Sequence, residues 1–146
     1  MKRLFSVFAL TICMLNLLVS PALAADDDMS YTIFYEDGSY AIVEFGVDNF
    51  TRSNTNGQVA YTYYNSLGQR CFTYTLCAIF TYNGVTSRAD SCDYMVAIHR
   101  QGWSLSTHSE YVSGSTAYGR ASFTGPDGQV RTASLTLTCD KNGNVT

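Results

Sequence analysis

The feature that most constrains this chain is a two-residue alternation that recurs along most of its length. It is clearest over residues 70–82, RCFTYTLCAIFTY, where Phe72, Tyr74 and Leu76 alternate with threonine and cysteine. Successive side chains of a β-strand point to opposite faces of a sheet, so the pattern predicts a strand with one apolar face directed into a core. After residue 24, no segment has the sustained apolar spacing of an amphipathic helix.

Short turn motifs separate the alternating segments. Asp37-Gly38 and Asn83-Gly84 favour tight reversals, because these residues tolerate the positive φ angles that such turns require. We expect strands over residues 30–35, 40–47, 58–64, 70–82, 85–99, 103–112, 116–124 and 130–140, and a polar loop over residues 48–57. The predicted fold is all-β: an antiparallel β-sandwich of seven or eight strands, immunoglobulin-like in size, with an up-and-down β-barrel as the alternative.

The first 24 residues have the composition of a secretory signal peptide. Lys2 and Arg3 precede an apolar stretch over residues 4–19, and Ala22-Leu23-Ala24 matches a small-residue cleavage site. We therefore expect cleavage after Ala24 and a secreted, extracellular protein. No membrane segment is expected once the signal peptide is removed.

The remaining chain is expected to consist of an acidic flexible leader over residues 25–29 and a single domain over residues 30–146. Without Lys2 and Arg3 the sequence has seven basic and twelve acidic residues, a net charge of −5. Nucleic acids and anionic lipids attract positively charged proteins, so neither is an expected partner.

Four cysteines follow the predicted cleavage site: Cys71, Cys77, Cys92 and Cys139. In a small exported domain an even number of cysteines indicates disulfides first, and the spacing matches neither a zinc site nor a C-x-x-C redox motif. No metal or cofactor is expected.

The pairing of these cysteines stays open. Cys71 and Cys77 on one extended strand would lie about 20 Å apart, too far for a disulfide. The alternatives are 71–139 with 77–92, 71–92 with 77–139, or a single bridge between Cys92 and Cys139, which both fall on predicted inward faces. The single bridge is slightly favoured.

Several of these segments resemble a known group of proteins. They are Phe80-Thr81-Tyr82-Asn83-Gly84 with a cysteine eight residues later, the strand containing Trp103, and the ending over residues 135–144, LTLTCDKNGN. Over about residues 58–146 the chain is similar to small secreted β-rich proteins from Gram-positive, mostly gut-dwelling, bacteria, a group without an assigned activity. The resemblance implies an exported β-rich domain and a structural role for Cys92 and Cys139. Cys77 departs from the pattern, and no catalytic residues carry over.

The sequence contains no recognisable catalytic motif. His99 and His108 are expected at the surface, and neither belongs to a Ser-His-Asp or G-x-S-x-G pattern. Glu44 and Glu110 are the best-placed carboxylates for a glycosidase-like pair, which would require them to face each other across a cleft. A small hydrolase using such a pair is therefore one alternative function, and a bacteriocin-like secreted effector is another.

The eleven tyrosines supply the main functional hypothesis. If Tyr61, Tyr63 and Trp103 lie exposed on one sheet, they form an aromatic face that can stack on sugar rings or grip a protein. We therefore expect a secreted, non-enzymatic domain that binds a glycan, a cell-wall component or a protein. The opposing interpretation is that these rings fill the core.

Overall fold

The computed structural model describes residues 29–49 and 53–146 and contains eight antiparallel strands in two sheets, with no helix among those residues. The predicted signal peptide and most of the acidic leader lie outside the described residues. The described part of the chain contains no helix that could cross a membrane. Seven glycines in the turns have positive φ, including Gly38 and Gly84 of the two turn motifs.

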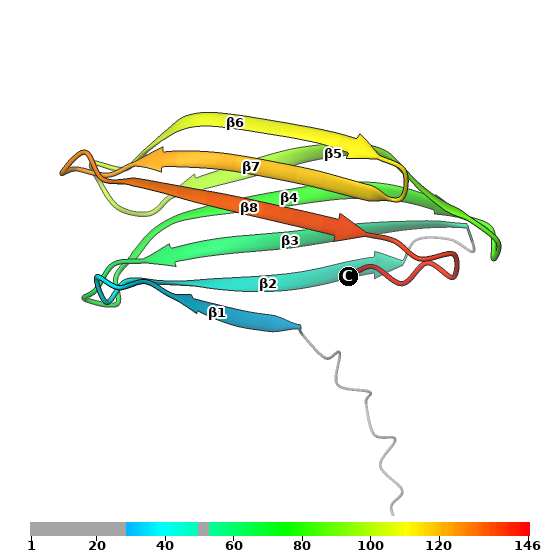
Figure 1. Ribbon diagram of the computed structural model, residues 1–146, viewed down its shortest axis with the longest axis horizontal. Coiled ribbons are helices and arrows are strands. Elements are labelled where there is room, and N and C mark those ends of the chain that lie inside the picture. Colours follow the sequence, from blue (N-terminus) through cyan, green and yellow to red (C-terminus); the bar gives the residue numbers. More distant parts are fainter. Residues whose placement is uncertain (1–28, 50–52) are drawn as a thin grey trace, which may run out of the picture.

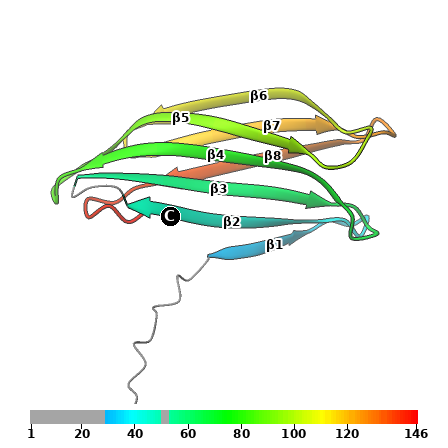
Figure 2. The same ribbon diagram turned by 180° about the vertical axis from the view of Figure 1, so that it is seen from behind.

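The five-stranded sheet contains the first five strands in sequence order: β1 (Ser30–Phe34), β2 (Tyr40–Asn49), β3 (Asn54–Tyr64), β4 (Arg70–Tyr82) and β5 (Ser87–Ile98). The three-stranded sheet contains β6 (Ser104–Ser113), β7 (Thr116–Thr124) and β8 (Val130–Thr138). Figure 1 looks onto the three-stranded sheet, and Figure 2 onto the outer face of the five-stranded sheet. The antiparallel sandwich is therefore confirmed. The sheets do not close into a barrel, so the alternative is wrong.

The core lies between the inner faces of the two sheets. Phe72, Tyr74, Leu76 and Phe80 of β4 are fully buried, as their alternation with polar residues predicts. Phe72 stacks on Phe123 of β7 with their ring centroids 3.8 Å apart. Burial of such side chains, each worth about 1.5–3 kcal/mol, holds the two sheets together.

The expected loop over residues 48–57 is largely wrong, because β2 and β3 extend into it. Asp48 pairs with Asn56 and Asn49 with Thr55, so backbone hydrogen bonding continues through a polar segment. Thr55 is completely buried, and Gly57 is buried beneath Val145. Tertiary packing of these two small residues outweighs the poor strand propensity of the surrounding asparagines.

The C-terminal segment closes one end of the sandwich. Asp140 accepts hydrogen bonds from the backbone N–H groups of Asn142 and Asn144, which forms a compact turn. The chain then returns to β8: Thr138 and Thr146 exchange two backbone hydrogen bonds of 2.8 and 2.9 Å. Val145 is buried as a result.

Candidate functional site

The structure places the predicted aromatic face inside the protein. Tyr61, Tyr63 and Trp103 are 2%, 1% and 6% exposed, so they form no binding surface. Tyr63 and Trp103 contact each other with centroids 5.2 Å apart, and Trp103 also packs on Phe72 at 5.1 Å. The prediction of an exposed face made by these residues is wrong, because the register of β3 turns both tyrosines toward β4 and the opposite sheet.

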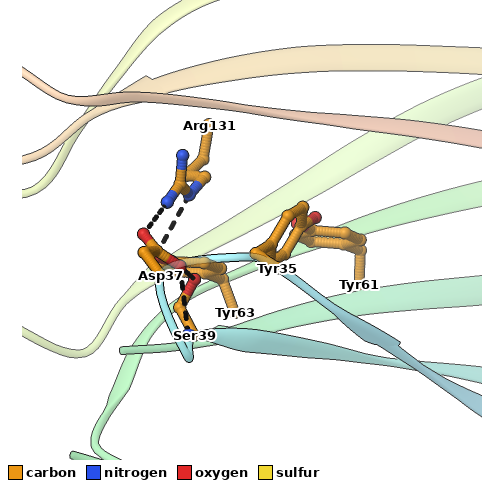
Figure 3. Close-up of polar contacts among 6 residues, drawn as sticks. All are labelled: Tyr35, Asp37, Ser39, Tyr61, Tyr63 and Arg131. Atoms are coloured by element: carbon orange, nitrogen blue, oxygen red, sulfur yellow. Dashed lines mark hydrogen bonds and ion pairs between the residues drawn. The ribbon is translucent and has the colours of Figure 1, made fainter. Parts of the chain in front are cut away.

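A polar network at one end of the core explains how the tyrosine hydroxyls are accommodated. The guanidinium of Arg131 on β8 donates a 3.1 Å hydrogen bond to the Tyr63 hydroxyl and forms an ion pair with Asp37 (Figure 3). The Tyr61 and Tyr35 hydroxyls are 2.5 Å apart. Burial, followed by the hydrogen bond to Tyr35, raises the pKa of Tyr61 far above its ordinary value, so this phenol stays neutral.

This network ties the turn between β1 and β2 to the opposite sheet. Arg131 also lies over the rings of Tyr35 and Tyr63, at 5.1 and 5.5 Å from their centroids. The side-chain and backbone hydrogen bonds from Ser39, and then the charge of Arg131, lower the pKa of Asp37. Among the described residues, no buried side-chain nitrogen or oxygen lacks a hydrogen-bond partner, and the members of this set bond one another, which indicates a structural brace.

A different aromatic row lies on the outer face of the five-stranded sheet. Phe34, Tyr40 and Tyr64 occupy paired positions on β1, β2 and β3. Tyr40 and Tyr64 stack in parallel with centroids 4.8 Å apart, and Phe34 contacts Tyr40 at 6.2 Å. The Arg70 guanidinium extends the row, 5.8 Å from the Tyr64 centroid. Phe34 is 79% exposed, so the row ends in a ring that is open to a partner.

Two adjoining hollows on the same outer face form what we call the trough. Their volumes are about 480 and 490 Å³, and both are lined by Gly46 and Gln58. Gly46 makes this depression possible, because a Cβ at this position would lie 2.9 Å from the Gln58 side-chain nitrogen. Ala60 and Thr75 form much of the remaining floor.

The walls of the trough carry carboxylate and amide groups. Asp48 and Asp93 line the first hollow with Asn56 and Gln58, and Glu44 lines the second. Among the described residues that line the two hollows, none is lysine or arginine. The trough therefore offers hydrogen-bond donors and acceptors within a negative electrostatic environment.

The two carboxylates predicted to form a catalytic pair do not meet. Glu44 lies on the outer face of the five-stranded sheet, where it is paired with Ser30 and Ala60. Glu110 lies on the inner face of β6 and accepts a 2.8 Å hydrogen bond from the Tyr74 hydroxyl. They belong to opposite sides of the five-stranded sheet, so Glu44 and Glu110 do not form the predicted carboxylate pair.

Glu110 instead belongs to a network between β4, β5 and β6. Its second carboxylate oxygen lies 3.0 Å from Nδ1 of His108, and Nε2 of His108 lies 3.1 Å from the Tyr94 hydroxyl. We call the space between the neighbouring edges of β5 and β6 the seam, and these side chains fill it. His108 was expected simply to face solvent; 40% of its side chain is exposed, but both ring nitrogens have protein partners.

The structure brings no two of the four predicted disulfide cysteines together, and all four are free thiols. Cys77 pairs with Asp93 and Cys92 with Ala78, so Cys77 and Cys92 point to opposite faces of one sheet. The Cys139 carbonyl accepts a hydrogen bond from Ser87, five residues from Cys92, or about 16 Å along β5.

Cys77 is also five residues from Tyr82, the partner of Ser87, so it lies about as far from Cys139 as Cys92 does, and the two pairings that involve Cys71 are separated further. Ser87 pairs with Tyr82, so Cys139 lies near the far end of β4 from Cys71, about 36 Å away along the strand. Cys71 is also seven residues from Ala78, the partner of Cys92, which corresponds to about 23 Å. None of the predicted disulfides has a bonding geometry in this arrangement of strands.

Comparisons of the chain with protein-family models, curated proteins and solved structures find no match in any of the three. None of them therefore assigns an enzymatic activity. Among the described residues, no group of three or more His, Cys, Asp or Glu side chains could hold a metal ion.

The outer aromatic row and the trough were both missed by sequence reasoning. The turn motif would not have located the row, because a two-residue Asp37-Gly38 turn would pair Tyr35 with Tyr40, whereas the loop over residues 36–38 pairs Phe34 with Tyr40. The trough had no local signal either, because its floor is made by small side chains on four different strands.

Proposed function

We propose that the protein is a secreted, non-enzymatic binding domain that binds a glycan on the outer face of its five-stranded sheet. The trough is the observation that carries this proposal, because a hollow of this size with a few converging polar groups is the usual form of a small-ligand site. Export is supported by the signal-peptide pattern of residues 1–24.

The chemistry of the trough favours an uncharged sugar. Amide and carboxylate side chains such as Asn56, Gln58 and Asp93 can together donate and accept hydrogen bonds from neighbouring hydroxyl groups. Anionic glycans and phosphate-rich polymers are disfavoured, because Glu44 and Asp48 repel them.

The aromatic row extends the same face. Glu44 on β2 lies four residues from Tyr40, or about 13 Å along the strand, so an oligosaccharide can span both features. The exposed face of Phe34 supplies an apolar surface for the C–H groups of a sugar ring. A flat protein partner would contact the row but leave most of the trough unfilled.

A glycan array probed with the purified protein, followed by calorimetry on the strongest ligand, tests the proposal. Ala60→Trp places a large ring in the trough and is expected to weaken binding by at least tenfold, which corresponds to about 1.4 kcal/mol. Ser134→Trp is the matched control, because Ser134 is exposed on the outer face of the other sheet.

The proposal fails if the array shows no glycan binding. It also fails if Ala60→Trp binds as tightly as the Ser134→Trp control, because the ligand would then occupy another surface. Sequencing of the N-terminus of protein recovered from culture medium tests export separately, and Ala25 is the expected first residue.

A further inference from the structure

The seam contains an arrangement that binding on the outer face does not require. The Tyr94 hydroxyl is 3.1 Å from Nε2 of His108, and Nδ1 of the same ring is 3.0 Å from a carboxylate oxygen of Glu110. The three groups therefore form a chain of hydroxyl, imidazole and carboxylate. An activated nucleophile has this form: a hydroxyl within reach of a base that a third group orients.

The direction of the hydrogen bonds follows from the chemistry of the three groups. An ionised carboxylate can only accept, so Nδ1 of His108 carries the proton that bonds Glu110. In the neutral ring, Nε2 is then the unprotonated nitrogen, and it accepts a hydrogen bond from the Tyr94 hydroxyl. The imidazole is held in the one tautomer that can remove the phenolic proton.

Glu110, on β6 of the three-stranded sheet, is itself held in place from the five-stranded sheet. The Tyr74 hydroxyl donates to its other oxygen at 2.8 Å, and only 11% of the Glu110 side chain is exposed. Tyr74 can reach this position because Gly119 on β7 has no side chain: a Cβ there would lie 2.5 Å from the hydroxyl oxygen. A fixed carboxylate orients the ring in the way that second-shell carboxylates orient histidine elsewhere.

The nucleophile is also accessible. Tyr94 is only partly buried and 40% of the His108 side chain is exposed, so a small reagent can approach the seam from solvent. A thiol, Cys92, lies nearby, two residues from Tyr94 on the same face of β5. Burial, followed by the charge of Glu110, raises the pKa of the Cys92 thiol and keeps it protonated.

We propose that Tyr94, activated by His108 and Glu110, is a nucleophilic site that accepts an acyl group from an activated carboxylic ester. The Tyr94 oxygen attacks the ester carbonyl carbon and forms a new C–O bond. The bond from that carbon to the alkoxy or aryloxy oxygen breaks, and that group leaves with the electron pair. The phenolic proton passes to Nε2 of His108, where Glu110 balances the positive charge. One acyl-tyrosine forms, and no oxidant or reductant is involved.

p-Nitrophenyl acetate is a suitable probe, because acylation and release of p-nitrophenolate can be measured on the same sample of the folded chain. Mass spectrometry of peptides then gives the rate of acetylation of each tyrosine. Tyr94 is expected to react roughly 10²-fold faster than Tyr111 and Tyr118, the lower end of the range for general-base assistance. Those two rings stack on each other on β6 and β7 and provide an internal reference.

Two substitutions locate the chemistry. Tyr94→Phe is expected to abolish the fast phase, and His108→Gln to slow it by roughly 10²-fold. Tyr118→Phe is the control and should leave the rate unchanged. Circular dichroism and urea unfolding establish that each variant is folded.

The proposal is overturned if Tyr94 and Tyr111 react at similar rates in the unaltered protein, a comparison that needs no variant to fold. It is equally overturned if the acetyl group is found on His108 or Cys92, or if His108→Gln reacts as fast as the unaltered protein. Because the seam and the trough lie on different faces, each outcome is independent of glycan binding.

Discussion

Gly119 gives the sharpest test of how the two sheets are packed. It lies on the inner face of β7, opposite Glu110 on β6 and Leu135 on β8. A Cβ at this position would lie 2.5 Å from the Tyr74 hydroxyl oxygen and 3.0 Å from Cδ1 of Leu76. Gly119→Ala therefore inserts a methyl group where a fully buried ring already ends, and we expect a loss of stability.

The size of the loss follows from three contributions. Forcing a methyl group into a filled core costs about 1–3 kcal/mol. Displacing the Tyr74 hydroxyl from Glu110 breaks a hydrogen bond to a charged group, worth about 1.5–3 kcal/mol. Replacing glycine reduces the entropy of the unfolded chain, which returns about 0.4–1 kcal/mol. The expected destabilisation is about 2–5 kcal/mol, to be measured by urea unfolding monitored by circular dichroism.

A double-mutant cycle distinguishes a clash between the new methyl group and the Tyr74 hydroxyl from a general loss of core packing. Tyr74→Phe removes the oxygen that meets the new methyl group, so the combined variant should be more stable than the sum of the two single changes by at least about 1 kcal/mol. Gly46→Ala is the matched control, because this glycine also lies in a strand and its Cβ would meet only the flexible, exposed side chain of Gln58. It should change stability by less than about 1 kcal/mol.

A Gly119→Ala variant as stable as Gly46→Ala would contradict the close packing of β7 on Tyr74. Strict additivity in the cycle would also refute it, because the cost would then not arise from contact with the Tyr74 hydroxyl. The outcome also bears on the seam, since Tyr74 holds the carboxylate that orients His108.

Three further predictions test other parts of the structure. The pKa of Asp37 is lowered from 3.8 by hydrogen bonds from Ser39 and by Arg131, so its contribution to stability is present above about pH 4 and is lost as the pH falls through the lowered value. Asp37→Asn should therefore unfold more easily than the unaltered protein at pH 6, and the gap in unfolding midpoint should close toward pH 3; a constant gap would contradict this. Thiol alkylation of the folded protein should occur at the partly exposed Cys77 and Cys92, slowly because burial raises the pKa of both thiols, and at the buried Cys71 and Cys139 only after unfolding. Recovery of a disulfide-linked peptide would show that the strands are arranged differently. Val145→Ala should cost about 1–2 kcal/mol in urea unfolding, because it empties the space over Gly57, and no loss would mean that the C-terminal segment does not pack there.

Most of the fold could be predicted from the sequence because the information is local. The alternation in β4 alone identifies its buried face, and the glycine-containing turns mark where the chain reverses. The prediction of a loop over residues 48–57 was wrong for a physical reason that no local sequence pattern reveals. Asparagine and aspartate disfavour strands, but the neighbouring strand β4 continues as far as Tyr82 and offers backbone partners to Asn54 and Thr55.

Side-chain direction could be predicted within a strand, but what covers each face could not. Tyr61, Tyr63 and Tyr64 illustrate the difference, since their alternation correctly places Tyr64 opposite the other two. Whether a face is buried depends on what packs against it, and here Trp103 and Phe123 come from segments at least forty residues after Tyr63. An aromatic-rich strand therefore predicts an apolar face. Whether that face is buried in the protein's own core or against a partner is not predicted by the strand alone.

The seam network depends most strongly on tertiary structure. Tyr74, Tyr94 and His108 lie on β4, β5 and β6, and the strand that brings His108 into place belongs to a different sheet from the other two. Its position is decided by how closely β7 can approach β4, which depends on the missing side chain of Gly119. The absence of one methyl group therefore determines whether Tyr74 reaches Glu110, and through Glu110 which nitrogen of His108 faces Tyr94. A histidine that alternates with serine and threonine looks like a solvent-facing residue in the sequence, and only this chain of contacts makes it a base with a fixed tautomer.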